Sequence, residues 1–142
     1  MEKVRRMSPN LLCHDAVMER VLGFGGFFFT SEQPDCLARW YAEHLGVVDP
    51  GESYGDPVWR QEEGETVFAP FGPEHRDSPH LGPAGWGINF RVADLDAMVA
   101  QLRASGLEVD VDSERYPNGR FAQLHDLDGN PVQLWQPMPP EL

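Results

Sequence analysis

The stretch "GWGINFRVADLDAMVAQLRASGLEV", which spans residues 85–109, decides the fold class of this chain. Ile88, Phe90 and Val92 alternate with polar residues, and this pattern is typical of a strand with one buried face. Asp94 then stands where a helix N-cap is expected, and apolar residues at helical spacing follow up to Gly106. Another apolar segment comes after this glycine. The stretch therefore predicts a strand, a helix and a second strand in that order.

The C-terminal stretch "FAQLHDLDGNPVQLWQP", residues 121–137, continues this pattern with a hairpin. Two apolar segments flank an Asp-Gly-Asn turn, which is a strong signal for two antiparallel strands. Residues 85–137 together predict a module with the order β-α-β-β-β.

A second, earlier copy of this order begins at "GFGGFFF", about 60 residues upstream. It contains an apolar run at Phe27–Phe29, which is expected to form a buried strand, and a helical pattern that ends at Gly46. The segments "PVWRQEE" (57–63) and "ETVFAPF" (65–71) then predict a hairpin. A module with one helix cannot cover a sheet alone, so the two modules are expected to pair.

These patterns predict one domain over residues 21–137. Its modules cover about residues 21–71 and 85–137, and a Pro- and Gly-rich loop, residues 72–84, joins them. Residues 1–20 are expected to form an N-terminal extension, and residues 138–142 a tail.

The charge of the chain argues against two classes of partner. There are 11 Lys and Arg against 23 Asp and Glu, giving a formal net charge of −12. Such a chain repels nucleic acid and anionic lipid, and no apolar run approaches the roughly 20 residues of a membrane span. Two cysteines without a Cys-x-x-Cys motif favour a reduced, cytoplasmic protein.

Three stretches in this order resemble the vicinal oxygen chelate superfamily, which includes glyoxalase I, bleomycin-resistance proteins and extradiol dioxygenases. They are residues 27–46, residues 89–109 and the closing hairpin from Gly119 to Pro137. The resemblance implies an α+β fold in which two paired βαβββ modules form a cup-shaped mixed sheet with helices on the outer face. It also implies a homodimer, with the cup completed within one chain or across the interface.

The resemblance also bears on metal binding. Metal-dependent members carry His or Glu ligands on the first strand of each module and a Glu on the last strand. The matching positions fall at or beside Gly26, at or beside Gly87, and at Gln133. Glycine offers no ligand, and an amide is a poor replacement for a carboxylate at a divalent ion, so no metal or other cofactor is predicted.

A divalent metal bound by other residues is the alternative. Among the five histidines, only those in the loop segment "PEHRDSPH", residues 73–80, cluster with acidic residues. This segment lacks the spacing of two histidines on one helix face, which weakens the alternative.

Strand alternation predicts an aromatic-walled cup that also carries amide and guanidinium groups. Eight residues are candidates to line it: Trp59, Phe68, Asn89, Arg91, Tyr116, Arg120, Gln133 and Trp135. An arginine there could bind a carboxylate or a phosphate. The competing interpretation is that the aromatic residues belong to the core and that each arginine pairs with a nearby acidic residue.

The leading hypothesis is therefore a metal-independent protein that binds or sequesters an aromatic or amphipathic small molecule. No titratable group suited to general acid or base chemistry is expected in the cup, so no catalytic residue is assigned and enzymatic activity is not favoured. The alternative is a lyase, isomerase or dioxygenase of the glyoxalase kind with a non-standard metal site. A third hypothesis is a regulatory or assembly module whose cup is filled by its own side chains.

Overall fold

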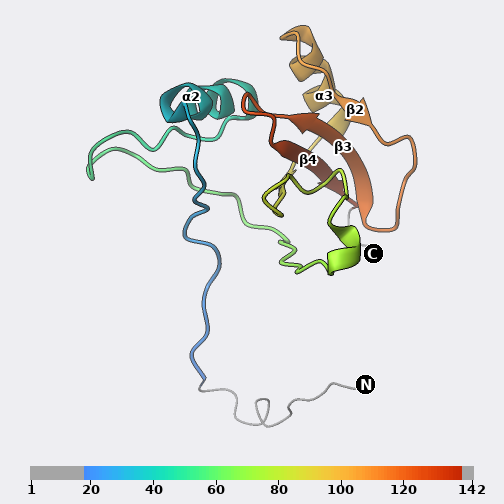
Figure 1. Cartoon of the computed structure of the whole chain (residues 1–142), viewed down its shortest axis with the longest axis horizontal. Helices are drawn as coiled ribbons and strands as arrows, with labels where there is room; N and C mark the ends of the chain where they lie inside the picture. The colour runs from blue at the N-terminus through green and yellow to red at the C-terminus, as the bar shows by residue number, and fades with distance from the viewer. Residues whose placement is uncertain (1–17, 139–142) are drawn as a thin grey trace. The chain divides into compact units, whose positions relative to one another are not determined.

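The computed structural model of the chain describes residues 18–138 (Figure 1). It divides into two compact units, Met1–Thr30 and Ser31–Leu142. Most of the expected N-terminal extension and nearly all of the expected tail lie outside the described residues.

The second unit contains one four-stranded sheet. Its strands are β1 (Ile88–Arg91), β2 (Asp110–Val111), β3 (Gly119–His125) and β4 (Pro131–Pro137), in the spatial order β1-β4-β3-β2. β1 runs parallel to β4, and the other neighbours are antiparallel. The helix α3 lies between β1 and β2 in the chain, so the βαβββ order expected for residues 85–137 is confirmed (Figure 1).

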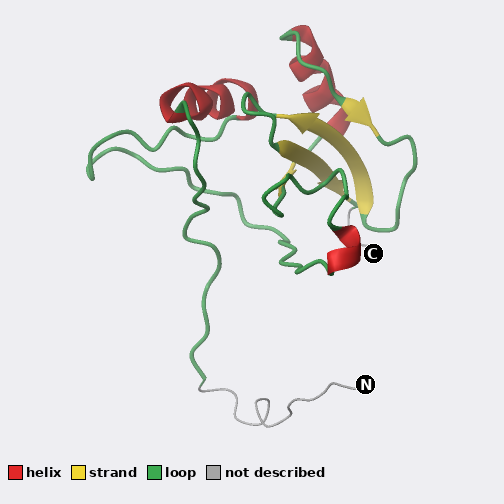
Figure 2. Cartoon of the chain, in the orientation of Figure 1, coloured by secondary structure: helices red, strands yellow, loops and turns green. Residues whose placement is uncertain are grey.

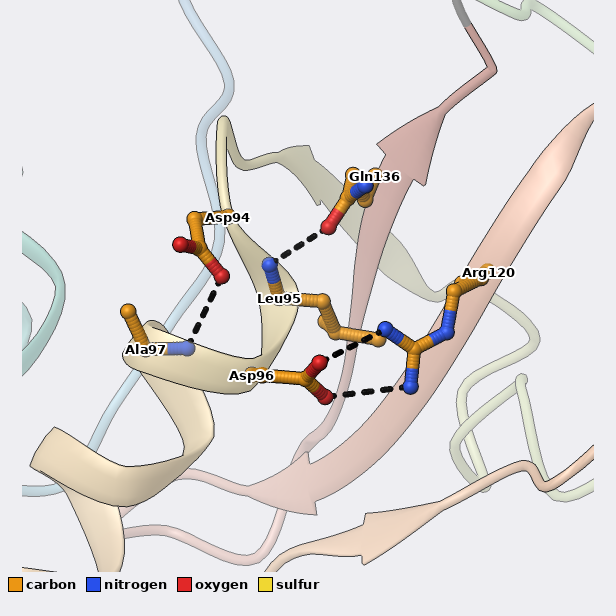
Figure 3. A network of polar contacts seen from close by, with 6 residues as sticks. All are labelled: Asp94, Leu95, Asp96, Ala97, Arg120 and Gln136. Atoms are coloured by element: carbon orange, nitrogen blue, oxygen red, sulfur yellow. Dashed lines mark hydrogen bonds and ion pairs between the residues drawn. The ribbon is translucent and has the colours of Figure 1, made fainter.

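Helix α3 (Leu95–Ala104) begins and ends where the sequence indicates. The side chain of Asp94 caps it by accepting a hydrogen bond from the backbone N–H of Ala97 at 3.0 Å (Figure 3). Gly106 follows its end with a φ of 88°, a conformation that other residues adopt at a cost. The apolar stripe of the helix packs on one face of the sheet, where Leu95 and Val132 are fully buried. Burial of this stripe is what holds helix and sheet together.

Helix α2 (Pro34–Leu45) contributes to the same core. Its residues Leu37, Trp40 and Tyr41 are buried in one cluster with the side chains of α3 and the sheet. The ring of Tyr41 lies 6.2 Å from that of Phe90 on β1, measured between centroids. The second helix predicted from the sequence is therefore present, and Gly46 ends it in the left-handed conformation.

The strands expected in the first module are not present in the described part of the chain. Residues 18–30 contain no strand, and Phe28 is 92% exposed, so the prediction of a buried strand at Phe27–Phe29 is wrong for this structure. Residues 57–71 likewise form loop rather than a hairpin (Figure 2). A short apolar run favours extended backbone, but a strand forms only when a neighbouring backbone accepts its hydrogen bonds. The fold is thus α+β with one mixed sheet, and a second, paired sheet remains a prediction.

The loop that precedes β1 contains a short 3-10 helix, η2 (Pro73–His75). Several backbone hydrogen bonds organise this loop, among them one from the N–H of Gly82 to the carbonyl oxygen of Trp86 at 2.8 Å. It is therefore a folded segment, and it brings residues 79 and 80 to the sheet.

Candidate functional site

The two faces of the sheet differ in character. Ala122, Leu124 and Leu134 point toward the helices and are buried. Side chains alternate along a strand, so their neighbours point to the other side, which we call the distal face. The distal face is formed by Asn89 and Arg91 of β1, Phe121 and Gln123 of β3, and Gln133 and Trp135 of β4.

One row of amide side chains crosses the distal face. Asn89 is aligned with Gln133, and Gln133 with Gln123, so three neighbouring strands each supply one amide. The Nδ2 of Asn89 donates to the Oε1 of Gln133 at 2.7 Å. The amide at position 133, where metal-dependent members of the superfamily carry a Glu, thus bonds to a second amide in the aligned position.

His80 joins this row from the loop. Its Nδ1 lies 3.0 Å from the Oε1 of Gln123 and 3.4 Å from the Nε2 of Gln133. The Nε2 of Gln123 donates to the carbonyl oxygen of Pro79 at 3.2 Å, which fixes the orientation of that amide. Gly87 permits this approach, because a Cβ at that position would collide with the carbonyl oxygen of His80.

A second row on the distal face is aromatic. Arg91 is aligned with Trp135, and Trp135 with Phe121. The rings of Trp135 and Phe121 are nearly parallel, at 5° with centroids 6.3 Å apart, and the ring of Tyr116 meets Phe121 edge-on at 5.8 Å. Trp135 is 6% exposed and its Nε1 donates to the carbonyl oxygen of Asn118 at 2.7 Å. The buried indole is thus held in one orientation, while the rings of Phe121 and Tyr116 retain exposed surface.

Tyr116 is held at the edge of this row by a carboxylate. Its hydroxyl donates to the Oδ2 of Asp112 at 2.8 Å, and this hydrogen bond raises the pKa of Tyr116. Backbone donation from Glu114, followed by the Tyr116 hydroxyl, lowers the pKa of Asp112. The phenol is therefore neutral, and the carboxylate beside it is charged.

The two candidate arginines lie in different environments. Nη2 of Arg91 donates to the carbonyl oxygen of Glu62 at 3.0 Å, and within the described residues no carboxylate forms an ion pair with it. Arg120 instead binds Asp96 of α3 through two hydrogen bonds of 3.1 Å on the helix side (Figure 3). These bonds lower the pKa of Asp96. Arg91 thus stands on the distal face, whereas Arg120 makes the structural ion pair that the competing interpretation expected.

Trp59 and Phe68 are not placed in these rows. The ring of Trp59 packs against Phe90, at 6.2 Å between centroids, and Phe90 belongs to the helix side of the sheet. Phe68 lies in the loop formed by residues 57–71 and is 81% exposed. Of the eight candidates, the structure brings five to the distal face or its edge: Asn89, Arg91, Tyr116, Gln133 and Trp135.

The residues on the distal face make a poor set of metal ligands. The amide row offers three carboxamides and the imidazole of His80, whereas a divalent ion prefers carboxylates or several imidazoles. Among residues 18–138, no three side chains of His, Cys, Asp or Glu gather closely enough to hold a metal ion. Metal independence itself stays a prediction.

A separate solvent-open hollow of about 380 Å³ lies beside the N-terminal part of α2. Its lining is polar and includes Asp35, Arg39 and Asp56. The Oδ2 of Asp56 accepts hydrogen bonds from the backbone N–H groups of Glu52 and Ser53, which lower the pKa of Asp56. That carboxylate is thus occupied in shaping a turn, and the hollow has none of the aromatic character expected of the ligand site.

Comparison with known proteins gives solved structures only. Neither a protein-family model nor a curated protein sequence matches the chain. A glyoxalase/bleomycin resistance protein from Streptomyces sp. CB03234 is 40% identical over 35% of this chain and 43% of its own, with a TM-score of 0.32. An antibiotic binding protein from the same organism is 22% identical over 77% of this chain and 89% of its own, with a TM-score of 0.46.

A glyoxalase family protein from Bacillus anthracis is 25% identical over 36% of this chain and 41% of its own, with a TM-score of 0.33. The match thus spans less than half the length of the first and third of these structures. The first and third of these structures carry the name of the glyoxalase family, which belongs to the superfamily that the sequence resembles. Because all three TM-scores are below 0.5, the function of this chain has to be argued from its own residues.

Sequence reasoning missed three residues of the distal face, namely His80, Phe121 and Gln123. Alternation in "GRFAQLH" places Phe121 and Gln123 opposite Ala122, so the signal for these two was present. For His80 the sequence gives no comparable signal, because its place depends on how the loop folds back over Gly87.

Proposed function

We propose that this protein binds a planar, largely apolar small molecule on the distal face, without a metal and without chemical conversion. The observation that supports this most is the aromatic row of Trp135, Phe121 and Tyr116 beside a row of polar side chains. Small-molecule sites typically combine apolar and aromatic surface with a few fixed polar groups that orient the ligand.

The rings suit a flat ligand for a physical reason. Aromatic pairs prefer offset or edge-on geometries and contribute about 0.5–1.5 kcal/mol beyond the area that they bury. The ring of Phe121 lies against Trp135, whose indole is held by its hydrogen bond to Asn118. The protein therefore loses little side-chain entropy when a ligand packs on Phe121. A rigid aromatic surface therefore favours rigid, flat ligands.

Binding is favoured over catalysis because of the contacts that the titratable groups of the distal face make. The imidazole of His80 contacts the amides of Gln123 and Gln133, and not a nucleophile that it could activate. General acid or base chemistry needs a group that changes protonation near the working pH. The pKa of Tyr116 is raised, away from neutral pH, and the proton of its hydroxyl is hydrogen-bonded to Asp112. Neither phenol nor carboxylate is thus poised to exchange a proton at neutral pH.

We further propose that the protein is a homodimer. Residues 57–71 expose several large apolar side chains, among them Val58, Val67, Phe68 and Phe71. Soluble proteins rarely leave such surface in water, and a second copy would cover it. Sedimentation equilibrium at micromolar concentration is expected to give twice the chain mass of 16.0 kDa. A mass equal to one chain would contradict the dimer.

The sequence also led us to expect a cytoplasmic protein without a membrane span. No helix in the part of the chain described here is long and apolar enough to cross a membrane. Cytoplasmic location remains a prediction.

A thermal-shift screen with planar aromatic compounds tests the proposed function. Compounds that bind are expected to raise the melting temperature of the wild type and of Phe28→Ala, and to lose this effect in Phe121→Ala. The two variants make the same chemical change, but only one alters the distal face. Equal loss in both variants, or no stabilising compound at all, would contradict the proposed site.

A further inference from the structure

We propose that His80 selects, among planar aromatic ligands, those that carry an uncharged phenolic hydroxyl. This inference rests on the proposed function and names the ligand class for the same site. It depends on which ring nitrogen of His80 is occupied and on where the other nitrogen lies relative to the aromatic row.

The shorter of the two contacts of Nδ1 determines which tautomer of His80 is assigned. The Nε2 of Gln123 donates to the carbonyl oxygen of Pro79, so the amide oxygen of Gln123 must be the atom that faces His80. An oxygen of this kind only accepts hydrogen bonds, whereas the Nε2 of Gln133, 3.4 Å from Nδ1, only donates. The contact with the oxygen of Gln123 is the shorter, at 3.0 Å, and we therefore assign the proton of the neutral ring to Nδ1. Nε2 is then the unprotonated nitrogen, and it presents a lone pair.

This lone pair is the acceptor that a ligand would meet. Across residues 18–138, no side chain or backbone group forms a hydrogen bond with Nε2 of His80. The neighbouring amides are bonded elsewhere, because Asn89 donates to Gln133 and Gln123 donates to the carbonyl oxygen of Pro79. In contrast, Nε2 of His75 in the same loop lies 3.6 Å from Glu74.

The spacing of the two rows sets the shape of the ligand. Gln133 and Trp135 are two residues apart on β4, so the polar and aromatic rows are separated by roughly 7 Å. A fused pair of aromatic rings spans about this length. A ligand packed on the exposed surface of Phe121 can therefore place a hydroxyl at its end beside His80.

Charge favours a neutral hydroxyl over a carboxylate. Asp112 lies at the edge of the aromatic row, where its Oδ2 accepts from the Tyr116 hydroxyl at 2.8 Å, and its lowered pKa keeps this carboxylate ionised. Arg91 stands at the opposite end of the aromatic row, with its guanidinium on the carbonyl oxygen of Glu62. A ligand anion on this row would thus be repelled by Asp112 at its edge, and the excess of acidic residues in the chain adds to this repulsion.

Isothermal titration calorimetry at pH 8, where an unperturbed imidazole is neutral, tests this selection with three probes of one ring system. They are 2-naphthol, 2-methoxynaphthalene, which cannot donate a hydrogen bond, and 2-naphthoate, which is anionic. The wild type is expected to bind 2-naphthol about tenfold more tightly than either of the others, which is the size of one net hydrogen bond. His80→Ala should remove this difference and leave the affinity for 2-methoxynaphthalene unchanged, whereas His75→Ala, a histidine of the same loop, should keep it.

Each other outcome counts against a specific claim. Equal binding of 2-naphthol and 2-methoxynaphthalene by the wild type would overturn the role of His80 and leave the proposed function standing. Tighter binding of 2-naphthoate would show an anion site instead. If none of the three binds at millimolar concentration, the proposed function fails and this inference fails with it.

A second measurement uses the wild type alone, so it does not depend on whether a variant folds. In nitrogen-15 spectra of the wild type, the Nε2 resonance of His80 is expected to shift with 2-naphthol and to stay unchanged with 2-methoxynaphthalene. A shift of equal size with both compounds would contradict a hydrogen bond at Nε2.

Discussion

Asp126 shows how a single buried carboxylate connects helix α2 to the hairpin. It is 6% exposed, and its Oδ2 accepts hydrogen bonds from the hydroxyl of Tyr41 at 2.6 Å and from Nδ2 of Asn130 at 2.9 Å. Its Oδ1 accepts from the backbone N–H groups of Asp128 and Asn130, each at 2.9 Å. Every donor here satisfies a charge that would otherwise be costly to bury.

Replacing Tyr41 with Phe is expected to destabilise the fold by about 1–3 kcal/mol, because a buried acceptor loses its donor. Urea denaturation followed by circular dichroism measures this free energy of unfolding. A difference below about 0.5 kcal/mol would indicate that the contact with Asp126 contributes little.

The stability difference between the wild type and Tyr41→Phe is expected to depend on pH in the alkaline range. Burial, and then the hydrogen bond to Asp126, raises the pKa of Tyr41 above its ordinary value of 10.0. The unfolded chain therefore loses this proton first as the pH rises above 10.0, so the contribution of Tyr41 to stability is complete below that pH and declines above it. The stability difference between wild type and Tyr41→Phe should narrow above pH 10.0, and a constant difference would contradict the shifted pKa.

At the scale of elements, the sequence predicts those parts whose partners lie close in the chain. Helix α3 is bounded by Asp94 and Gly106, and the hairpin of β3 and β4 turns at Gly129, all of which are local signals. The strand expected at Phe27–Phe29 is absent from the structure, because a strand depends on a neighbouring backbone that no local pattern supplies. Helices α2 and α3 and the hairpin of β3 and β4 were therefore predicted correctly, whereas the hairpin expected over residues 57–71 was not.

The same distinction separates the candidate residues of the site. Asn89, Gln133 and Trp135 were found by alternation, which is a local property of their strands. Arg120 was expected near the rim of the cup, but it shares a strand face with the buried Ala122 and lies on the helix side, where it binds Asp96 of α3. His80 depends on a loop contact across Gly87, and this contact leaves no periodic signal in the sequence.

Gly87→Ala is expected to displace the loop that carries His80. A Cβ there would collide with the carbonyl oxygen of His80, and relief of that overlap costs about 1–3 kcal/mol of stability. Affinity for 2-naphthol should fall to the level of His80→Ala, while 2-methoxynaphthalene should bind as before.

Gly55→Ala is the matched control, because nothing lies within 4 Å of a Cβ at that position. Calorimetry with both naphthalene compounds distinguishes the two glycine variants. Unchanged selectivity in Gly87→Ala would show that the loop does not depend on this close approach.

At the scale of the whole molecule, one complete βαβββ module carries both rows of the distal face. The sheet, helix α3 and the loop with His80 all belong to the unit Ser31–Leu142. The apolar side chains of residues 57–71 are the surface on which a second copy is proposed to pack. The central claim is therefore that this module binds a flat aromatic ligand through its own side chains and without a metal.

The measurement that tests this claim most directly is calorimetric titration of 2-naphthol into protein dialysed against EDTA. We predict one molecule bound per chain, with the same affinity as for untreated protein and with binding lost in Phe121→Ala. Binding that disappears after EDTA treatment and returns with added Zn²⁺, Ni²⁺, Mn²⁺ or Fe²⁺ would contradict the claim, as would no binding in either preparation.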